Sequence, residues 1–118
     1  MGDVSKWFLR EETEIPRVGR IVVREFSWAE MLAHDAGIKE AEADEKIQAL
    51  ARGLAPAVVE PEELREALAN GAEDLNLAIV NDVTRKVYRI NKIDAPWLEE
   101  IPEGSEHVPH VEDAAEDF

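Results

Sequence analysis

The stretch VGRIVVREFSWAEM, residues 18–31, joins a predicted β-strand directly to a predicted helix and decides the class of fold. Its first half is rich in β-branched residues that broadly alternate with other types, which is typical of a strand. Its second half contains the sequence SWAE at residues 27–30, a capping box that marks a helix start. The sequence therefore predicts a strand over residues 18–26 and a helix that begins at Trp28 and is ended by Gly37.

A lone strand is not stable, so residues 18–26 need a partner strand. Residues 8–15 could supply it within the chain, which would make a hairpin. A second copy of the chain could supply it instead. Self-association through residues 18–26 is therefore an open alternative.

The chain after residue 37 is predicted to be mainly helical. Residues 38–52 are dominated by strong helix formers and are followed by Gly53 as a helix stop, and Pro61 begins a shorter helix. Residues 73–92 carry apolar side chains at steps of three and four, which favours one helix. Their many β-branched residues leave a hairpin, turning at residues 81–82, as an alternative. The predicted fold class is mainly α, a small α+β domain with an N-terminal β strand or hairpin, three to four helices and an extended acidic tail.

The negative charge is concentrated at the end of the chain. The 118 residues include 27 acidic and 13 basic side chains, for a net charge of -14, and residues 93–118 contain nine acids and no Lys or Arg. Like-charge repulsion and few apolar residues argue against independent folding of this segment. We therefore expect a small helical domain over residues 1–93 and a flexible acidic tail over residues 94–118.

Two aromatic residues of this tail, Trp97 and Phe118, are candidate anchors on the domain or on a partner. The predicted last helix ends in a basic cluster of Arg85, Lys86, Arg89 and Lys92. Cations are favoured at a helix C-terminus, and these residues are also positioned to pair with the acidic tail.

Several classes of function find no support in the sequence. It contains no Cys, no phosphate-binding glycine loop and no nucleophile motif. His107 and His110 are separated by Pro109, which does not present two metal ligands on one helix. The net charge opposes nucleic-acid binding, and no apolar run approaches the roughly 18 residues of a membrane helix. We expect no catalytic residue, cofactor, metal, nucleic-acid or membrane partner, and a cytoplasmic protein that acts on another protein.

The order of motifs resembles the phage tail assembly chaperones. The opening DVSKWFL (residues 3–9), the extended IVVREF (residues 21–26) and the helix start SWAEM (residues 27–31) carry the resemblance, and residues 58–92 follow its outline. The last helix departs from the pattern, since it is more basic and β-branched, and Lys92 stands where glycine is common. The resemblance covers about residues 3–92.

The resemblance implies a non-enzymatic bacteriophage protein that binds the long helical tape measure protein and keeps it soluble during tail assembly in the host cytoplasm. It also implies a short form and a frameshifted long form. A small helical domain with an apolar surface and a high negative charge suits that role. The residues expected to bind the partner are Trp7, Phe8, Trp28, Met31, Ile79, Val83 and Val87.

A second hypothesis comes from the charge alone. An acidic regulatory or inhibitor protein would use residues 94–118 to block a basic or nucleic-acid-binding surface of a partner. Binding of that kind would depend steeply on salt. The position of Trp28 at a helix start favours a core or cap role for this residue over an interface role.

Overall fold

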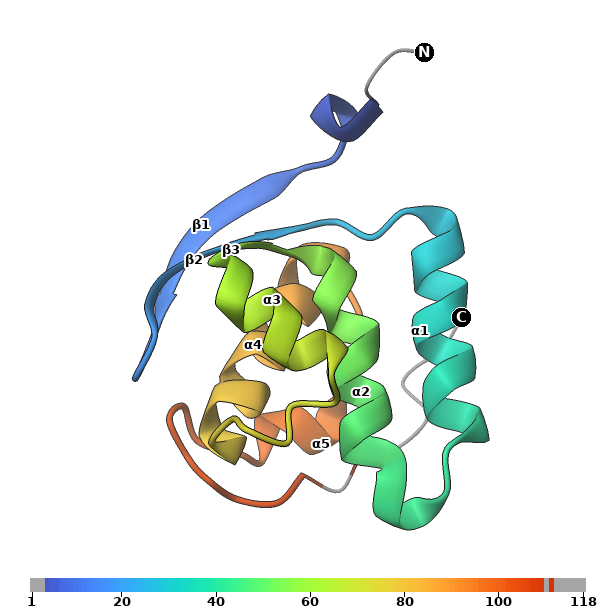
Figure 1. Ribbon diagram of the computed structural model, residues 1–118, viewed down its shortest axis with the longest axis vertical. Coiled ribbons are helices and arrows are strands. Elements are labelled where there is room, and N and C mark those ends of the chain that lie inside the picture. The colour runs from blue at the N-terminus through green and yellow to red at the C-terminus, as the bar shows by residue number, and fades with distance from the viewer. Residues whose placement is uncertain (1–3, 110, 112–118) are drawn as a thin grey trace.

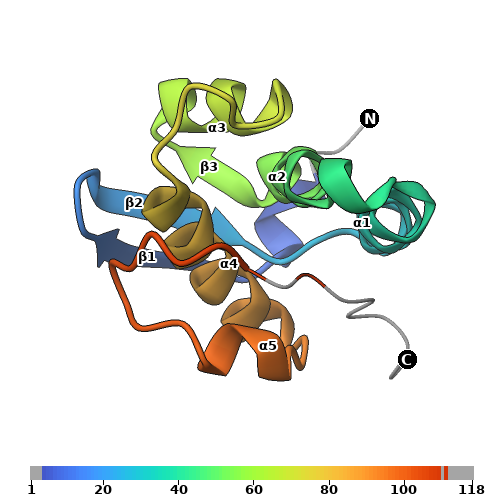
Figure 2. The same ribbon diagram turned by 90° about the horizontal axis from the view of Figure 1, so that it is seen from below.

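The computed structural model describes residues 4–109 and 111 and has the predicted α+β fold (Figure 1). Three antiparallel strands form one sheet in the order β1-β2-β3. Helix α4 packs on β1 and β2, while α1, α2 and α3 pack beside one another in chain order (Figure 2). The elements, with η for a 3-10 helix, are η1 (Val4–Trp7), β1 (Arg10–Ile15), β2 (Gly19–Arg24), α1 (Trp28–Glu40), η2 (Ala43–Glu45), α2 (Lys46–Leu54), η3 (Ala55–Ala57), β3 (Val58–Glu60), α3 (Glu62–Ala69), α4 (Leu77–Asn91) and α5 (Pro96–Glu99).

Strand β2 lies in the middle of the sheet. It pairs along its whole length with β1, and Val22 and Val23 also pair with β3. The tight turn into β2 depends on Gly19, whose φ of 90° a side chain would strain. The predicted hairpin is therefore confirmed. The partner strand of residues 18–26 thus comes from the same chain, and pairing of this strand with a second copy stays an untested alternative.

Helix α1 begins as predicted and ends later than predicted. The Ser27 hydroxyl accepts from the Glu30 amide at 3.1 Å, and the Ser27 amide donates to the Glu30 carboxylate at 2.8 Å, so the capping box is confirmed. The helix continues through Gly37 to Glu40 because Ile38 is buried in the core. The predicted stop at Gly37 is wrong.

The second predicted stop, Gly53, also lies inside a helix. A Cβ at this position would overlap the imidazole of His34, so α1 and α2 approach closely only with glycine here. The chain turns from α1 to α2 at Ala41 and Glu42 instead, where the backbone is extended. The sequence pattern identified both helices but placed their boundary wrongly.

Residues 77–91 form the single helix α4, so the hairpin alternative is excluded. Val80, Val83 and Val87 face the core with no more than 1% of their surface exposed. The helix ends at Lys92, which adopts a left-handed conformation with φ of 56°. Near this end the Asn91 side chain accepts from the Phe26 amide at 2.8 Å, which ties α4 to the junction between β2 and α1.

The segment after α4 packs back on the domain. Trp97, Leu98 and Ile101 are buried, and the Trp97 ring lies edge-on to Tyr88 with 6.3 Å between ring centroids. The structure therefore does not show the free tail that the acidic composition predicted for residues 94–109. Phe118, the other predicted anchor, lies outside the described residues.

Polar side chains of α4 hold this segment by its backbone. Arg85 donates to the carbonyl oxygens of Leu98 and Ile101, and the buried Asp82 carboxylate accepts from the Gly104 amide at 3.0 Å. Asn81 donates to two further carbonyl oxygens, of Ser105 and His107, at 3.1 and 2.9 Å. Helix α4 thus holds the acidic segment mainly through its peptide groups.

Arg85→Ala is expected to loosen the C-terminal segment. It removes the cation paired with the buried Asp82 carboxylate and leaves two carbonyl oxygens without their donor, at a cost of about 1–3 kcal/mol in the free energy of unfolding. Amide hydrogen exchange of residues 98–105 should accelerate with it. The control is Arg89→Ala, which removes an exposed pair with Glu11 and should cost under about 1 kcal/mol. Equal effects of the two variants would contradict the conclusion that Arg85 holds the C-terminal segment on the domain.

Candidate functional site

Helix α1 exposes large apolar side chains. Trp28 is 81% exposed and Leu32, one turn later on the same side, is 52% exposed. His34 and Ile38 are the α1 residues that reach the core. Trp28 thus has no core role and contributes its indole to the surface, so the interpretation that favoured a core or cap role for it is wrong.

A second exposed apolar group lies just before β1. Trp7 is 73% exposed and Leu9 is 65% exposed, while Phe8 is half-buried against the Arg24 guanidinium, 5.2 Å from its ring centroid. Arg24 in turn holds Glu30 of α1 through two hydrogen bonds of 3.0 and 2.8 Å. A chain of contacts therefore links the start of the hairpin to the first turn of α1.

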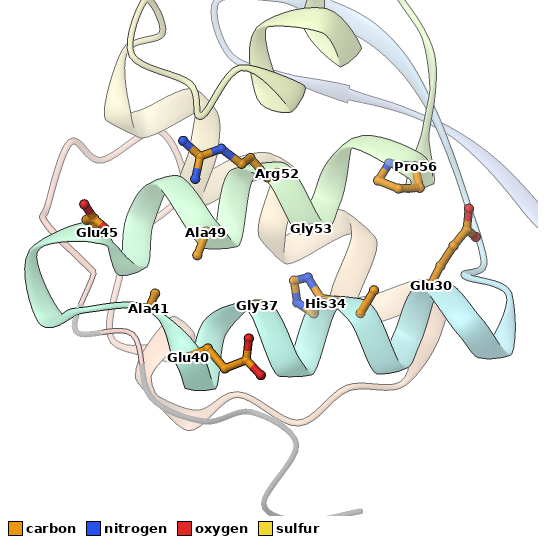
Figure 3. A pocket seen from close by; sticks show the side chains of 11 residues that line it. Glu30, His34, Gly37, Glu40, Ala41, Glu45, Ala49, Arg52, Gly53 and Pro56 are labelled. Carbon is orange, nitrogen blue, oxygen red and sulfur yellow. The ribbon is translucent and has the colours of Figure 1, made fainter.

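Helices α1 and α2 enclose a groove of about 410 Å³ (Figure 3). Small residues dominate its walls, and carboxylates and one guanidinium stand among them. The lining residues are Glu30, Ala33, His34, Gly37, Glu40, Ala41, Glu45, Ala49, Arg52, Gly53 and Pro56.

The floor of this groove contains a buried imidazole. His34 is 4% exposed, its Nε2 lies 2.7 Å from the Tyr88 hydroxyl, and its ring stacks on Phe26 with 5.3 Å between centroids. Burial lowers the pKa of His34 to about 4 and raises the pKa of Tyr88 well above its usual range. Both side chains are therefore neutral at pH 7. The His34 Nδ1 atom faces the backbone of Gly53, and a hydrogen bond to that backbone opposes part of the lowering of the pKa.

The structure separates the predicted partner-binding residues into two groups. Trp7 and Trp28 are exposed, and Phe8, Met31 and Ile79 are partly exposed. Val83 and Val87 have no exposed surface, so a partner cannot reach them in this fold. The prediction is wrong for these two valines because the stripe they belong to faces the sheet.

Three exposed apolar residues were not identified from the sequence, namely Leu9, Leu32 and Val108. Leu32 follows Trp28 by four residues, a spacing that places both on one face of a helix, so the signal was present. Leu9 lies directly before strand β1, and the sequence around it does not indicate whether its side chain is buried or exposed.

Clusters of three or more His, Asp or Glu side chains with the geometry of a metal site do not occur within residues 4–109. His110, one of the two histidines considered for a metal, is outside the described residues. None of the helices in the described part of the chain is long and apolar enough to cross a membrane. Comparison of the chain with protein-family models, curated protein sequences and solved structures finds no match.

The free energy of unfolding is expected to decrease as the pH is lowered, because of His34. The unfolded chain binds a proton on His34 below its usual pKa of 6.5, whereas the folded chain binds it only near pH 4. Stability contributed by the neutral imidazole is complete above pH 6.5 and declines as the pH falls towards 4, by about 2 kcal/mol at pH 5. Urea unfolding at pH 7 and pH 5 measures this difference.

His34→Phe should remove this part of the pH dependence while lowering stability at pH 7, since the Tyr88 hydroxyl loses its partner. His107→Gln, at an exposed histidine, is the matched control and should keep the wild-type pH dependence. An unchanged pH dependence in His34→Phe would contradict the assignment.

Proposed function

We propose that the protein is a non-enzymatic phage tail assembly chaperone that binds an apolar helical segment of the tape measure protein in the host cytoplasm. The observation that carries the proposal is the exposed apolar face of α1, formed by Trp28 and Leu32. An exposed tryptophan on a rigid helix is a common anchor of protein interfaces because it buries a large area with little loss of side-chain freedom.

The position of this face supports a role in binding, because the backbone that carries it is firmly held. The first turn of α1 is fixed by the Ser27 capping box and by Arg24, so Trp28 projects from a well-supported position. Trp7 and Leu9 add apolar surface at the start of the hairpin. A partner helix that covers Trp28 and Leu32 would hide apolar area that both proteins otherwise expose to water.

The charge of the chain supports the solubilising part of the role. A net charge of -14 over 118 residues opposes self-association of the chaperone and of its complexes. The first half of the chain supplies the apolar contacts, while the acids of residues 94–107 lie largely at the surface. The acidic inhibitor hypothesis rests on the same acidic residues but does not explain why Trp28 is exposed.

Trp28→Ser is expected to weaken partner binding at least tenfold and to leave the fold intact, because the side chain makes few contacts within the domain. Leu32→Ser should act in the same direction. The measurement is co-purification and titration with the long helical protein that we expect to be encoded directly downstream of this gene. Val108→Ser, which removes another exposed apolar side chain from the C-terminal segment, is the control and should bind as wild type.

The same titration separates the two hypotheses. Binding that survives 0.5 M salt and is lost in Trp28→Ser supports the chaperone, because apolar contacts are not screened. Binding that disappears with salt and is unaffected by Trp28→Ser would overturn it in favour of the acidic inhibitor. A gene for a long helical protein directly downstream, with a −1 slippery sequence near the end of this gene, is also expected.

A further inference from the structure

Strand β1 forms one outer edge of the sheet, on the side of β2 that faces away from β3 (Figure 2). In an antiparallel pair, every second residue turns its amide and its carbonyl towards the neighbouring strand. The Glu25 amide donates to the Leu9 carbonyl oxygen at 3.0 Å, which fixes this alternation for the hairpin. The backbone amides and carbonyls of Arg10, Glu12 and Glu14 therefore point away from β2. Within the described part of the chain they have no backbone partner.

The features that usually protect a free strand edge are weak in β1. Proteins blunt such edges with proline, with a bulge, with a very short strand or with charges that repel another strand. Strand β1 is six residues long, contains no proline and pairs with β2 without a break in register, since the irregularity of the sheet lies between β2 and β3. Its charges are of both signs, so whether they repel a second strand depends on the register in which that strand arrives.

We propose that two copies of this chain associate by antiparallel pairing of their β1 strands, with Glu12 of one copy opposite Glu12 of the other. The outward-facing backbone groups of the two edges then meet one another. The two three-stranded sheets join into one continuous sheet, related by a two-fold axis through its centre.

The charges of β1 select this register. Arg10 and Glu14 are exposed and form no ion pair within the described residues. With Glu12 at the axis, Arg10 of each copy lies directly opposite Glu14 of the other, and symmetry makes the contact twice. Opposite charges across a strand pair stabilise it, and like charges destabilise it. A shift of two residues in either direction breaks both contacts.

The two Glu12 side chains meet at the axis, but each has its own counter-ion. The Arg20 guanidinium binds Glu12, and it also reaches the Glu60 carboxylate of β3 at 3.0 Å. These three side chains form a row across the outer face of the sheet. A positive group beside each Glu12 offsets the repulsion between the two carboxylates.

The other face of the sheet provides a second, independent observation. Side chains alternate along a strand, so Leu9 lies on the same face as Ile15 and as Glu11, which binds Arg89 of α4 at 2.7 Å. Ile15 is 3% exposed, whereas Leu9 is 65% exposed. In the proposed register, Leu9 of each copy lies opposite Ile15 of the other. Association therefore covers an apolar side chain that the single domain leaves in water.

The net charge of -14 opposes association of two copies and limits how far it proceeds. At about 0.15 M ionic strength, charges more than roughly 8 Å apart are largely screened, while groups that meet at the strand edge remain within that distance. The opposite edge of the sheet, β3, is three residues long and offers no comparable site. Association therefore stops at a weak dimer, and the net charge keeps dimers apart. This surface is separate from the Trp28 face of α1, so the inference goes beyond the proposed function.

The first test is sedimentation equilibrium of the full chain in about 0.15 M salt, from about 1 µM to about 1 mM protein. We expect the weight-average mass to rise from 13.2 kDa towards twice that value. Amide hydrogen exchange at the high concentration should slow at Arg10, Glu12 and Glu14, because their amides gain acceptors in the dimer.

Charge exchange makes the test specific. Arg10→Glu and Glu14→Arg each place like charges opposite one another and should weaken self-association roughly tenfold or more. In an equimolar mixture of the two variants, both contacts again join opposite charges, so a mixed dimer of about wild-type strength should form. If net charge alone governed association, Glu14→Arg would strengthen it instead. Arg65→Glu, at an exposed arginine of α3, is the control that changes the net charge as Arg10→Glu does and should associate within about twofold of wild type.

Four results would overturn the proposal. These are a mass that stays at one chain up to about 1 mM, wild-type association of either charge variant, failure of the mixed variants to associate, and unchanged exchange of the three outward-facing amides. Recovery in the mixture also shows that both variants fold. Loss of the dimer in Trp28→Ser would place the interface on α1 and would overturn the proposal as well. Binding of the tape measure protein through Trp28 is decided by the separate titration.

Discussion

The hydrogen bond between His34 and Tyr88 fixes α1 to the body of the domain. Apart from its packing on α2, α1 reaches the core through His34 and Ile38, and His34 is the residue that contacts α4 across 2.7 Å. Because both rings are neutral and buried, water does not compete for this bond. The narrow attachment leaves most of the surface of α1 outside the core, so Trp28, Leu32 and Gly37 are exposed as a consequence of it.

Helix α4 holds the C-terminal segment on the body of the domain. Its valines pack under the sheet, while Asn81, Asp82 and Arg85 face the returning chain and bind peptide groups of residues 98–107. Buried polar groups are costly unless they are paired, and this arrangement pairs most of them. Recognition of backbone atoms explains how a segment with so many acids is held next to the domain without an acid–base pair for each one.

The sequence predicted what local rules control and missed what tertiary contacts decide. The Ser27 capping box and the periodicity of residues 73–92 are local signals, and they correctly predicted the start of α1 and the single helix α4. The roles of Gly37 and Gly53 depend on what a Cβ would meet in space, which spacing along the chain does not contain. The docking of residues 94–109 rests on carbonyl oxygens, which every sequence supplies, so composition pointed to a free tail.

Helix α1 departs from two of the local rules that helices usually follow. A globular helix normally hides its largest apolar side chains, avoids glycine in its interior and satisfies its buried polar atoms. Helix α1 breaks the first rule at Trp28 and the second at Gly37, while buried side-chain atoms without a partner occur on other elements, at Gln48, Asn81, Asp82 and Trp97. Sequences tend to break such rules at functional sites, where binding compensates for the lost stability. Among the α-helices of the described chain, α1 is the one that exposes large apolar side chains, at Trp28 and Leu32, so its surface is the one best suited to bind a partner.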